Sequence, residues 1–290
     1  MGAGIIFLSQ NDPLSQAFGE QCGDSFEYYV QDSNIDIRDI DSLSRIIDAS
    51  SPTVLINAVD FNDIDTAEFR REEAYRINST SVKSIAEICA RNNTLLVHVS
   101  TSCVFDGDSA RPYNEEDVPA PISAFGDSKL LGEYNIRTSG ENHLIVRIPE
   151  CYGTGKSPFN LRFVKREHEK SFAVVSGNTV SPVSAVDAVI AILTLIEKGA
   201  RGTFHAGQEG HATAEDFLST TMTVLKSHGR DFPDVTVRTI DPKEMALPGD
   251  RPLLDVLDLS KYRSCAGATP RHWQQALEHY ISINLDTVSP

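Results

Sequence analysis

The sequence predicts an α/β protein, a Rossmann-type doubly wound parallel sheet with a smaller C-terminal substrate lobe. Short apolar runs of strand length alternate with amphipathic segments of helix length through the first half of the chain. Beyond Tyr152 this alternation weakens, and glycine and proline interrupt the sequence more often. Hydrophobic residues make up 40% of the 290 residues, enough for a large core. We therefore expect a Rossmann nucleotide-binding domain over residues 1–152 and a mainly substrate-binding lobe over 153–290, interleaved with the last sheet strands.

Five apolar runs are expected to form the buried strands of this sheet. Each is short and almost continuously hydrophobic, which is typical of parallel strands covered by helices on both faces. In such a sheet the carboxyl ends of the strands border the crevice in which dinucleotides bind. The expected strands are 4–9, 28–30, 53–57, 95–100 and 144–147.

Helices are expected where apolar residues recur three and four positions apart. One such stretch includes Leu43 and Ile47, and a second runs from Ala74 to Cys89. In the second half of the chain, helices are expected at about 186–198, 214–227 and 272–283.

The charge and the cysteine pattern exclude several classes of function. The chain carries 26 Lys and Arg against 41 Asp and Glu, a formal net charge of −15, which disfavours binding to nucleic acid or to an anionic membrane surface. The apolar runs are too short to span a membrane and no secretory signal pattern is present, so a cytoplasmic location is expected. The five cysteines and eight histidines lack zinc-site or CxxC spacing, so we expect neither a metal site nor disulfides.

Short polar and glycine-containing motifs follow one another along nearly the whole chain. They are Asp36-Ile-Arg-Asp39, Asn57-Ala-Val59, Ala74-Tyr-x-x-Asn78, Val99-Ser-Thr101, Val104-Phe-Asp-Gly107, Pro112-Tyr-x-Glu-Glu-Asp117, Gly126-Asp-Ser-Lys-Leu-Leu-Gly-Glu133, Val146-Arg147, Ser181-Pro182 with Asp187, and Leu257-Asp258 with Trp273. In this order they resemble the dTDP-4-dehydrorhamnose reductase (RmlD-like) family of extended short-chain dehydrogenases/reductases. Each motif is weak alone, but the ordered set is specific, and the chain is identified as a degenerate member.

The resemblance implies that a 4-keto nucleotide sugar is reduced with a nicotinamide cofactor by a Ser/Thr, Tyr and Lys set, in which tyrosine donates the proton. Thr101 matches the hydroxyl residue and Lys129 the lysine, but Phe125 occupies the tyrosine position. Phenylalanine has no proton to donate, and a general acid typically contributes ~10²- to 10⁴-fold in rate. Alternatively, Thr101 ends a strand and bonds to the next turn, and Lys129 belongs to an ordinary amphipathic helix.

The turn after the first strand also departs from the family pattern, which is roughly Gly-x-x-Gly-x-x-Gly. Ser9, Asp12 and Ser15 occupy the glycine positions, and Asn11 and Leu14 lie between them as expected, vestigial cofactor contacts. The glycines allow a tight turn and the close approach of a diphosphate. A carboxylate at this place opposes a diphosphate by ~4 kcal/mol per pair of unit charges at about 4 Å and an effective dielectric near ~20.

Further cofactor contacts are expected at the ends of the second and third strands. These are Asp39, and then Asn57, Ala58 and Val59, with Lys129 also counted among them. The competing interpretation of Asp39 is a cap for the helix that follows it.

Substrate contacts are expected at Ser102, Cys103 and Glu150. Ser102-Cys103 stand where the family usually has Asp-Tyr, and Pro149-Glu150 where it usually has Ser-Trp. We therefore expect a sugar-nucleotide pocket that differs from the family's own.

Two hypotheses of function follow. In the first, the chain has lost normal NAD(P)H-dependent reduction, needs no cofactor, and acts as a regulatory pseudoenzyme that binds a protein partner or a nucleotide-sugar-like molecule. In the alternative, it is an active reductase of a dTDP-4-keto-6-deoxy sugar or a related nucleotide sugar, which uses NADPH or NADH and a water in place of the phenol. Because the phosphate turn and the proton donor are altered together, the sequence favours the first hypothesis. A homo-oligomer is compatible with both.

Overall fold

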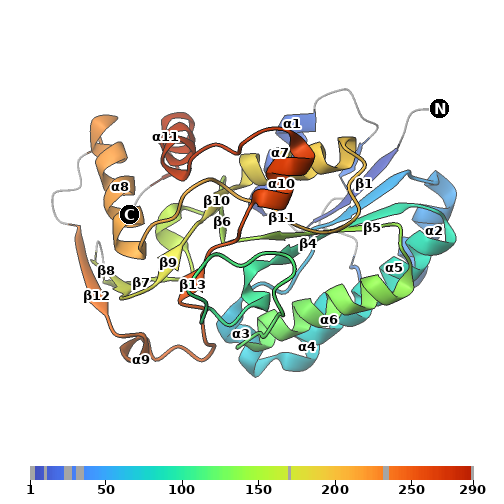
Figure 1. Cartoon of the computed structure of the whole chain (residues 1–290), viewed down its shortest axis with the longest axis horizontal. Coiled ribbons are helices and arrows are strands. Elements are labelled where there is room, and N and C mark those ends of the chain that lie inside the picture. Colours follow the sequence, from blue (N-terminus) through green and yellow to red (C-terminus); the bar gives the residue numbers. More distant parts are fainter. Residues whose placement is uncertain are drawn as a thin grey trace.

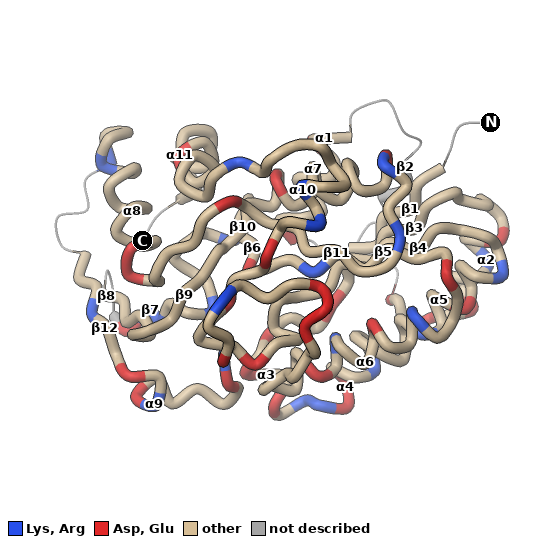
Figure 2. Tube along the Cα trace, in the orientation of Figure 1, with Lys and Arg blue, Asp and Glu red and all other residues tan. Residues whose placement is uncertain are grey.

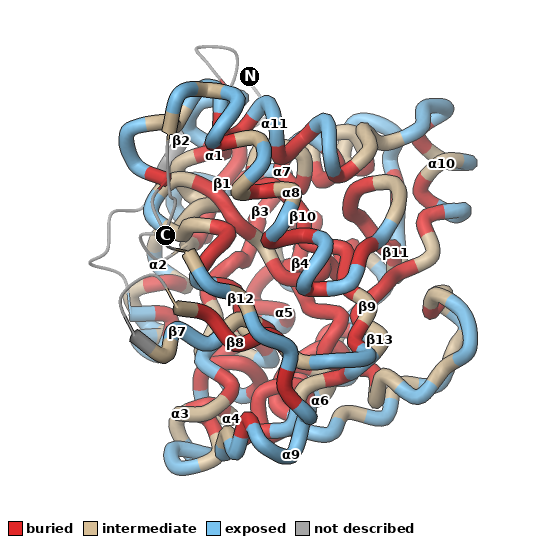
Figure 3. The backbone as a smooth tube through the Cα atoms, turned by 90° about the vertical axis from the view of Figure 1, so that its left-hand side faces the viewer, coloured by how far each residue is buried: buried red, intermediate tan, exposed pale blue. Residues whose placement is uncertain are grey.

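The computed structural model shows a large sheet covered by helices and, beside it, a smaller group of strands and helices (Figure 1). Figure 3 shows that the strands of the large sheet run through the buried interior. The residues that the structure describes are 4–9, 12–22, 28–30, 36–168, 171–230 and 235–288.

Six parallel strands form the large sheet. They are β1 (Ile5–Leu8), β2 (Tyr28–Val30), β3 (Val54–Asn57), β4 (Leu95–Thr101), β5 (His143–Ile148) and β11 (Gly202–His205). Their spatial order is β2, β1, β3, β4, β5, β11, so the chain turns to one side after β1 and crosses to the other side at β3. This order confirms the predicted doubly wound sheet. The reversal between β1 and β3 opens a crevice at the carboxyl ends of the strands.

Helices cover both faces of this sheet because successive residues of a strand point to opposite sides. The helices are α1 (Pro13–Cys22), α7 (Ala185–Glu197) and α10 (Ser260–Ala266) on one face, and α2 (Ile40–Ser50), α5 (Val82–Arg91) and α6 (Ala124–Ser139) on the other. On β1, for example, Ile5 and Phe7 pack with the first group, whereas Ile6 and Leu8 pack with the second.

The helix predicted from Ala74 to Cys89 is interrupted in the structure. After α3 (Ile64–Phe69), the chain forms α4 (Arg71–Tyr75), a π-helical segment (Arg76–Ser81) and then α5. Asn78 in this segment donates from Nδ2 to Ser128 Oγ at 2.9 Å. Segments of this kind are frequent near functional sites. The apolar positions Ile77 and Val82 are five residues apart across this segment, a wider spacing than the three or four of a regular helix.

The lobe is built from residues after Glu150 and has a core of its own, in which Phe217 packs against Trp273 with ring centroids 5.5 Å apart. Its helices α8 (Ala214–Ser227) and α9 (Pro242–Met245) lie on the left in Figure 1. The other elements are β6 (Cys151–Tyr152), β7 (Val164–His168), β8 (Ser171–Val175), β9 (Thr179–Val180), β10 (Val183–Ser184), β12 (Thr236–Ile240), β13 (Leu254–Asp255) and α11 (Trp273–Ile283). Helices α7, α8 and α11 begin and end within about one residue of the predicted bounds.

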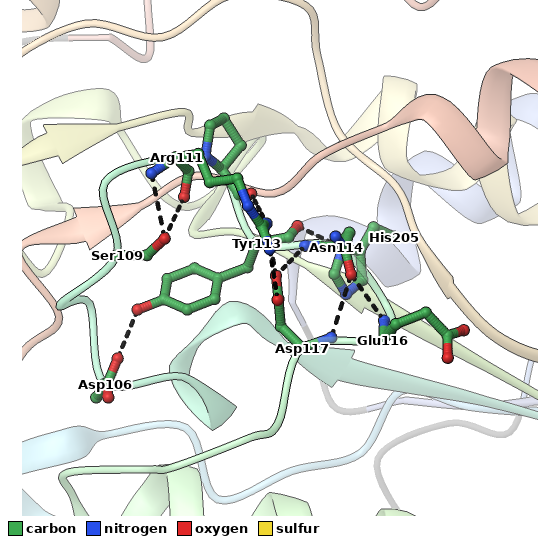
Figure 4. A network of polar contacts seen from close by, with 9 residues as sticks. Asp106, Ser109, Arg111, Tyr113, Asn114, Glu116, Asp117 and His205 are labelled. Atoms are coloured by element: carbon green, nitrogen blue, oxygen red, sulfur yellow. Dashed lines mark hydrogen bonds and ion pairs between the residues drawn. The ribbon is translucent and has the colours of Figure 1, made fainter.

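The loop that follows β4 is held against β11 by a polar network (Figure 4). Arg111 forms two hydrogen bonds of 2.8 Å with the Asp117 carboxylate, and the Tyr113 hydroxyl donates to Asp106. Nδ1 of His205, at the end of β11, lies 3.1 Å from the Tyr113 carbonyl oxygen. These contacts fix the loop beside the carboxyl end of the sheet.

The described surface carries both signs of charge. Figure 2 shows Lys and Arg spread over many elements, with no continuous basic stripe among the residues drawn in that view. None of the helices in the described stretches is long and apolar enough to cross a membrane. Within the same stretches, no group of three or more His, Cys, Asp or Glu is placed to hold a metal ion.

Candidate active site

A crevice opens where the carboxyl ends of β1, β3, β4 and β5 meet the loop that leads into the lobe. This is the position at which doubly wound sheets bind their ligands. The lining residues are Asp12, Pro13, Leu14, Ala58, Asp60, Asn62, Val99, Ser100, Thr101, Phe125, Ile148, Pro149, Glu150, Cys151, Lys156 and Arg162.

Thr101 and Phe125 form part of the crevice wall. Thr101 ends β4, and its Oγ1 accepts a hydrogen bond of 3.1 Å from the Cys103 N–H. The Thr101 hydroxyl also hydrogen-bonds to the Cys103 side chain, so a ligand in the crevice would compete with that sulfur for the hydroxyl proton. Phe125 lies in the first turn of α6, is 3% exposed and packs against Cys103 and Ala74. The structure thus places an apolar ring where the resemblance implied a phenol.

Lys129 lies behind this wall, one helical turn after Phe125. Its ammonium group donates to the Val99 carbonyl oxygen at 2.8 Å and lies 3.5 Å from Asp60. The Lys129 side chain is only 1% exposed and does not itself line the crevice, whereas Val99 and Asp60 do. Its positive charge is therefore held directly beneath the crevice surface.

Asp12 sits at the beginning of α1, at the turn where the glycines are missing. Its Oδ1 accepts a hydrogen bond of 2.8 Å from the Ser15 N–H, so it caps the helix end that would otherwise face a phosphate. Burial raises the pKa of Asp12 to about 6, with a smaller contribution from the charge of Asp60, although hydrogen bonds from Ser15 and Ser9 oppose the rise. At neutral pH Asp12 thus places a negative charge at the crevice.

We expect Asp12→Asn to stabilise the fold above pH ~7, by about 1–2 kcal/mol after allowance for partial exposure. Because the folded-state pKa of Asp12 is raised from 3.8 to about 6, ionisation costs stability as the pH rises through the folded value. Asparagine keeps the helix cap without the charge. Urea unfolding should show the gain above pH ~7 and none below the ordinary carboxyl pKa of 3.8.

The control for this prediction is Asp39→Asn, at the exposed cap of α2. Asp39 accepts a hydrogen bond of 3.1 Å from the Ser42 N–H, and hydrogen bonds from the Ser42 hydroxyl and from this N–H lower the pKa of Asp39. Removal of its charge should therefore give no gain above pH ~7. Equal stabilisation by both changes would show that burial of Asp12 is not the cause.

The expected cofactor contacts divide into two groups. Leu14 and Ala58 line the crevice. Asn57 is fully buried below it, where its Oδ1 accepts a hydrogen bond of 3.2 Å from the Val59 N–H and its Nδ2 lies 3.2 Å from Nδ1 of His98. Val59 packs in the core with α2 and α5. Asn57 and Val59 therefore shape the end of β3 instead of facing a ligand.

The remaining expected cofactor contacts lie elsewhere. Asp39 caps α2, in agreement with the competing interpretation of this residue. Ser15 is in the first turn of α1 and Ser9 follows β1, but neither is among the lining residues of the crevice. Asn11 lies outside the described residues.

Of the three expected substrate contacts, Glu150 lines the crevice, whereas Ser102 and Cys103 are buried behind it. Glu150 pairs with Lys156, and its Oε2 lies 3.0 Å from Nε of Arg162. Ser102 accepts a hydrogen bond of 3.2 Å from Nη2 of Arg162. Burial raises the pKa of the Cys103 thiol to about 11, so it is not a thiolate nucleophile at neutral pH.

Four polar lining residues were not singled out from the sequence: Asp60, Asn62, Lys156 and Arg162. Asp60 directly follows the expected contacts Asn57–Val59. Its position after the third strand would have predicted it by the same reasoning. Lys156 follows Gly-Thr-Gly, and this composition predicts a loop without indicating a functional residue. No local pattern points to Arg162.

A second cavity lies in the lobe next to the crevice. Its floor is one face of the parallel β9–β13 ladder, in which Val180 pairs with Asp255. Because alternate residues of a strand share a face, Asn178 and Val180 point into this cavity beside Leu253 and Asp255. The other lining residues are Arg162, Phe163, Val175, Pro242, Met245, Leu247, Gly249, Asp250, Arg251 and Pro252.

Comparison with known proteins agrees with this architecture. The family described as RmlD substrate binding domain matches residues 9–285. The chain belongs to the RmlD family. A dTDP-4-keto-6-deoxy-D-glucose reductase of Streptomyces niveus is 33% identical over 258 residues, which cover 87% of each chain. A dTDP-4-dehydrorhamnose reductase of Mycobacterium tuberculosis is 34% identical over 266 residues, which cover 89% of this chain and 84% of that relative.

Solved structures carry the same RmlD fold. A dTDP-4-dehydrorhamnose reductase from Clostridium acetobutylicum superposes with a TM-score of 0.87 at 26% identity, covering 97% of this chain and 99% of that one. A dTDP-4-dehydrorhamnose reductase from Bacillus anthracis, solved in complex with NADP, has a TM-score of 0.85 at 23% identity and covers 98% and 100%. The family resemblance predicted from the ordered motifs is confirmed.

Proposed function

We propose that this RmlD-family chain is an active NAD(P)H-dependent reductase of a nucleotide-linked keto sugar, such as a dTDP-4-keto-6-deoxy sugar. The observation that carries the proposal is the Thr101 hydroxyl at the crevice surface with the buried Lys129 ammonium group behind the same wall. The two relatives at 33% and 34% identity are both named as reductases of dTDP-linked sugars, which favours activity over its loss.

The crevice residues fit a nicotinamide group better than they fit a diphosphate. Val99, Ile148 and Pro149 give the inner crevice an apolar surface that suits a nicotinamide ring. At the α1 end, the charge of Asp12 opposes a diphosphate, and Lys156 on the same crevice is already paired with Glu150. We therefore expect weaker cofactor binding than a glycine-rich turn would give.

The residues of this chain act on the substrate's keto oxygen. When bound, a reduced nicotinamide supplies the hydride. Thr101 donates a hydrogen bond to the keto oxygen, and the nearby charge of Lys129 stabilises the negative charge that develops there. Because Phe125 has no proton to give, a water beside Thr101 delivers the proton. Reduction is accordingly expected to be slower by ~10²- to 10⁴-fold than with a phenol donor.

Binding and turnover test this proposal in two steps. Purified protein is titrated with NADPH and with NADH, followed by fluorescence and melting temperature, and then assayed with a dTDP-4-keto-6-deoxy sugar for loss of the reduced cofactor. We expect micromolar binding of at least one cofactor and slow turnover that Thr101→Val abolishes and Thr101→Ser retains. Absence of a melting shift with either cofactor would overturn the proposal.

A second candidate function is a ligand-binding or regulatory pseudoenzyme, and the buried Phe125 at the proton-donor position favours it. In this case the crevice binds a nucleotide-sugar-like molecule or supports a protein contact without chemistry. The same experiment separates the two functions, because a pseudoenzyme would bind the sugar nucleotide yet show no reduced-cofactor consumption even at long incubation.

A further inference from the structure

Asp12 is the carboxylate on the crevice that no described cation neutralises. Glu150 pairs with Lys156, and Asp60 lies 3.5 Å from the Lys129 ammonium group beneath the crevice surface. Within the described stretches, no Lys, Arg or His forms an ion pair with Asp12, and Asp60 adds a second negative charge close to it. The crevice therefore holds one acidic group whose charge is left without a partner.

Other titratable groups around Asp12 do not remove this charge. Cys151, on β6, keeps its proton because burial raises the pKa of its thiol. Arg162 is held between two buried carboxylates. On α7, which packs against α1, Asp187 is paired with Arg271. Loss of the negative charge at this end of the crevice thus requires a proton on Asp12 itself.

The first turn of α1 has few N–H groups left for an anion. Pro13 has no N–H, and the N–H groups of Leu14 and Ser15 both donate to the Asp12 carboxylate, that of Ser15 at 2.8 Å. The beginning of a helix normally binds a phosphate through such N–H groups. In this chain, ionised Asp12 both occupies them and repels a diphosphate.

A proton on Asp12 removes the repulsion and supplies a new hydrogen-bond donor. One oxygen of the neutral carboxyl still accepts from the Ser15 N–H, and the other carries an O–H that can donate to a phosphate oxygen. A hydrogen bond from an O–H to a charged oxygen is short and strong. The neutral form is accessible near neutral pH, because burial raises the pKa of Asp12 to about 6.

We propose that Asp12 takes up a proton when the nicotinamide cofactor binds, and that its neutral carboxyl then donates a hydrogen bond to the cofactor's diphosphate. This inference rests on the proposed function, because it takes the crevice as the cofactor site. Binding that takes up a proton becomes weaker as the pH rises. A glycine-rich turn has no side chain that could couple cofactor binding to pH in this way.

Calorimetric titration of the full chain with NADH at several pH values tests the inference. NADH is the probe because it lacks the phosphate monoester of NADPH, which itself titrates near pH ~6. We expect the affinity to fall by about 20- to 100-fold between pH ~6.5 and pH ~8.5, as the protonated fraction of Asp12 falls. Titrations at pH ~7.5 in two buffers of different ionisation enthalpy should show the uptake of nearly one proton for each NADH bound.

Two substitutions separate the charge of Asp12 from its role as a donor. Asp12→Asn resembles the protonated residue, because its amide donates a hydrogen bond and carries no charge. It should bind NADH with one affinity at every pH, at least as tightly as the unchanged protein at pH ~6.5, and should take up no proton. Asp12→Ala should be equally insensitive to pH but bind about 10-fold more weakly than Asp12→Asn, because it lacks the donor.

The matched control is Asp63→Asn, at the cap of α3. Asp63 accepts a hydrogen bond of 2.6 Å from the Thr66 N–H, but it is exposed and does not line the crevice. This variant should keep the full pH dependence and the proton uptake of the unchanged protein.

The outcomes separate this inference from the proposed function. If the unchanged protein binds NADH equally tightly at all these pH values, or if Asp12→Asn keeps the pH dependence, the role of Asp12 is overturned while cofactor use stands. If neither protein binds NADH or NADPH at any pH, cofactor use itself is wrong and both proposals fall. A chain that binds only NADPH is compared in the same way, since the titration of the extra phosphate is common to both proteins and cancels.

A further variant keeps the test decisive if Asp12→Asn does not fold, as judged by its melting curve. Asp12→Ser then takes its place, because serine also caps a helix and carries an uncharged hydroxyl donor. Binding of NADH by Asp12→Ser that still weakens as the pH rises would overturn the inference.

Discussion

Glu133→Ala is expected to lower the free energy of unfolding by about 3–5 kcal/mol, because it leaves a buried guanidinium without its partner. Glu133 is fully buried on α6, and its oxygens lie 2.9 and 2.7 Å from Nε and Nη2 of Arg147, which is itself 1% exposed. The Ser100 hydroxyl donates to the same carboxylate at 2.6 Å. This pair therefore supports the end of β4 from below the crevice.

Urea unfolding at neutral pH measures the effect of Glu133→Ala. Burial alone would raise the pKa of Glu133, but Arg147 and Ser100 hold it below the ordinary value of 4.5. The stability that this carboxylate contributes is thus present above that value and is lost as the pH falls through the folded-state pKa, so the two proteins should converge in acid.

Two further variants show whether the pair or the packing matters. Glu133→Met combined with Arg147→Met removes both charges and should recover much of the loss, because apolar replacements of a buried pair are often neutral. Arg137 contacts the same carboxylate from a 38% exposed position, and Arg137→Ala should cost no more than ~1 kcal/mol. A loss of that size for Glu133→Ala would mean that the ion pair is not buried in solution.

The sheet could be predicted from the sequence because its strands are buried on both faces. Val54–Asn57 and Leu95–Thr101 are therefore buried at every position and mostly apolar, without the three- and four-residue apolar spacing of the helices between them. The short strands of the lobe could not be predicted in the same way. Strands of two residues, such as β9 and β13, are too short to show an alternation of apolar and polar residues. They form because the chain on either side brings them together.

The candidate site was predictable only in part, for a related reason. Thr101, Ala58 and Leu14 were found because strand ends and the first turn of a helix are fixed by local sequence. Arg162 was not found, since its partners Ser102 and Asp255 lie 60 and 93 residues away along the chain. The sequence shows that Ser102 and Glu150 each differ from the residue usual in the family. The structure shows that both side chains contact Arg162.

Phe125→Tyr is expected to raise the turnover number of the proposed reduction by about 10²- to 10⁴-fold, the usual contribution of a positioned general acid. Phe125 already lines the crevice and begins the helical turn that ends at Lys129, so a hydroxyl on its ring would enter a site with a positive charge nearby. Steady-state assays of both proteins with a dTDP-4-keto-6-deoxy sugar and saturating reduced cofactor measure the change.

The affinity for cofactor should change little in Phe125→Tyr, because the substitution leaves Asp12 and the turn that begins α1 unchanged. The gain should therefore fall on the turnover number and not on the cofactor's dissociation constant. It should also depend on the lysine, so that adding Lys129→Met to Phe125→Tyr removes most of it. Equal turnover by Phe125→Tyr and the unchanged protein would mean that proton donation does not limit the rate, and that the water beside Thr101 already replaces the phenol.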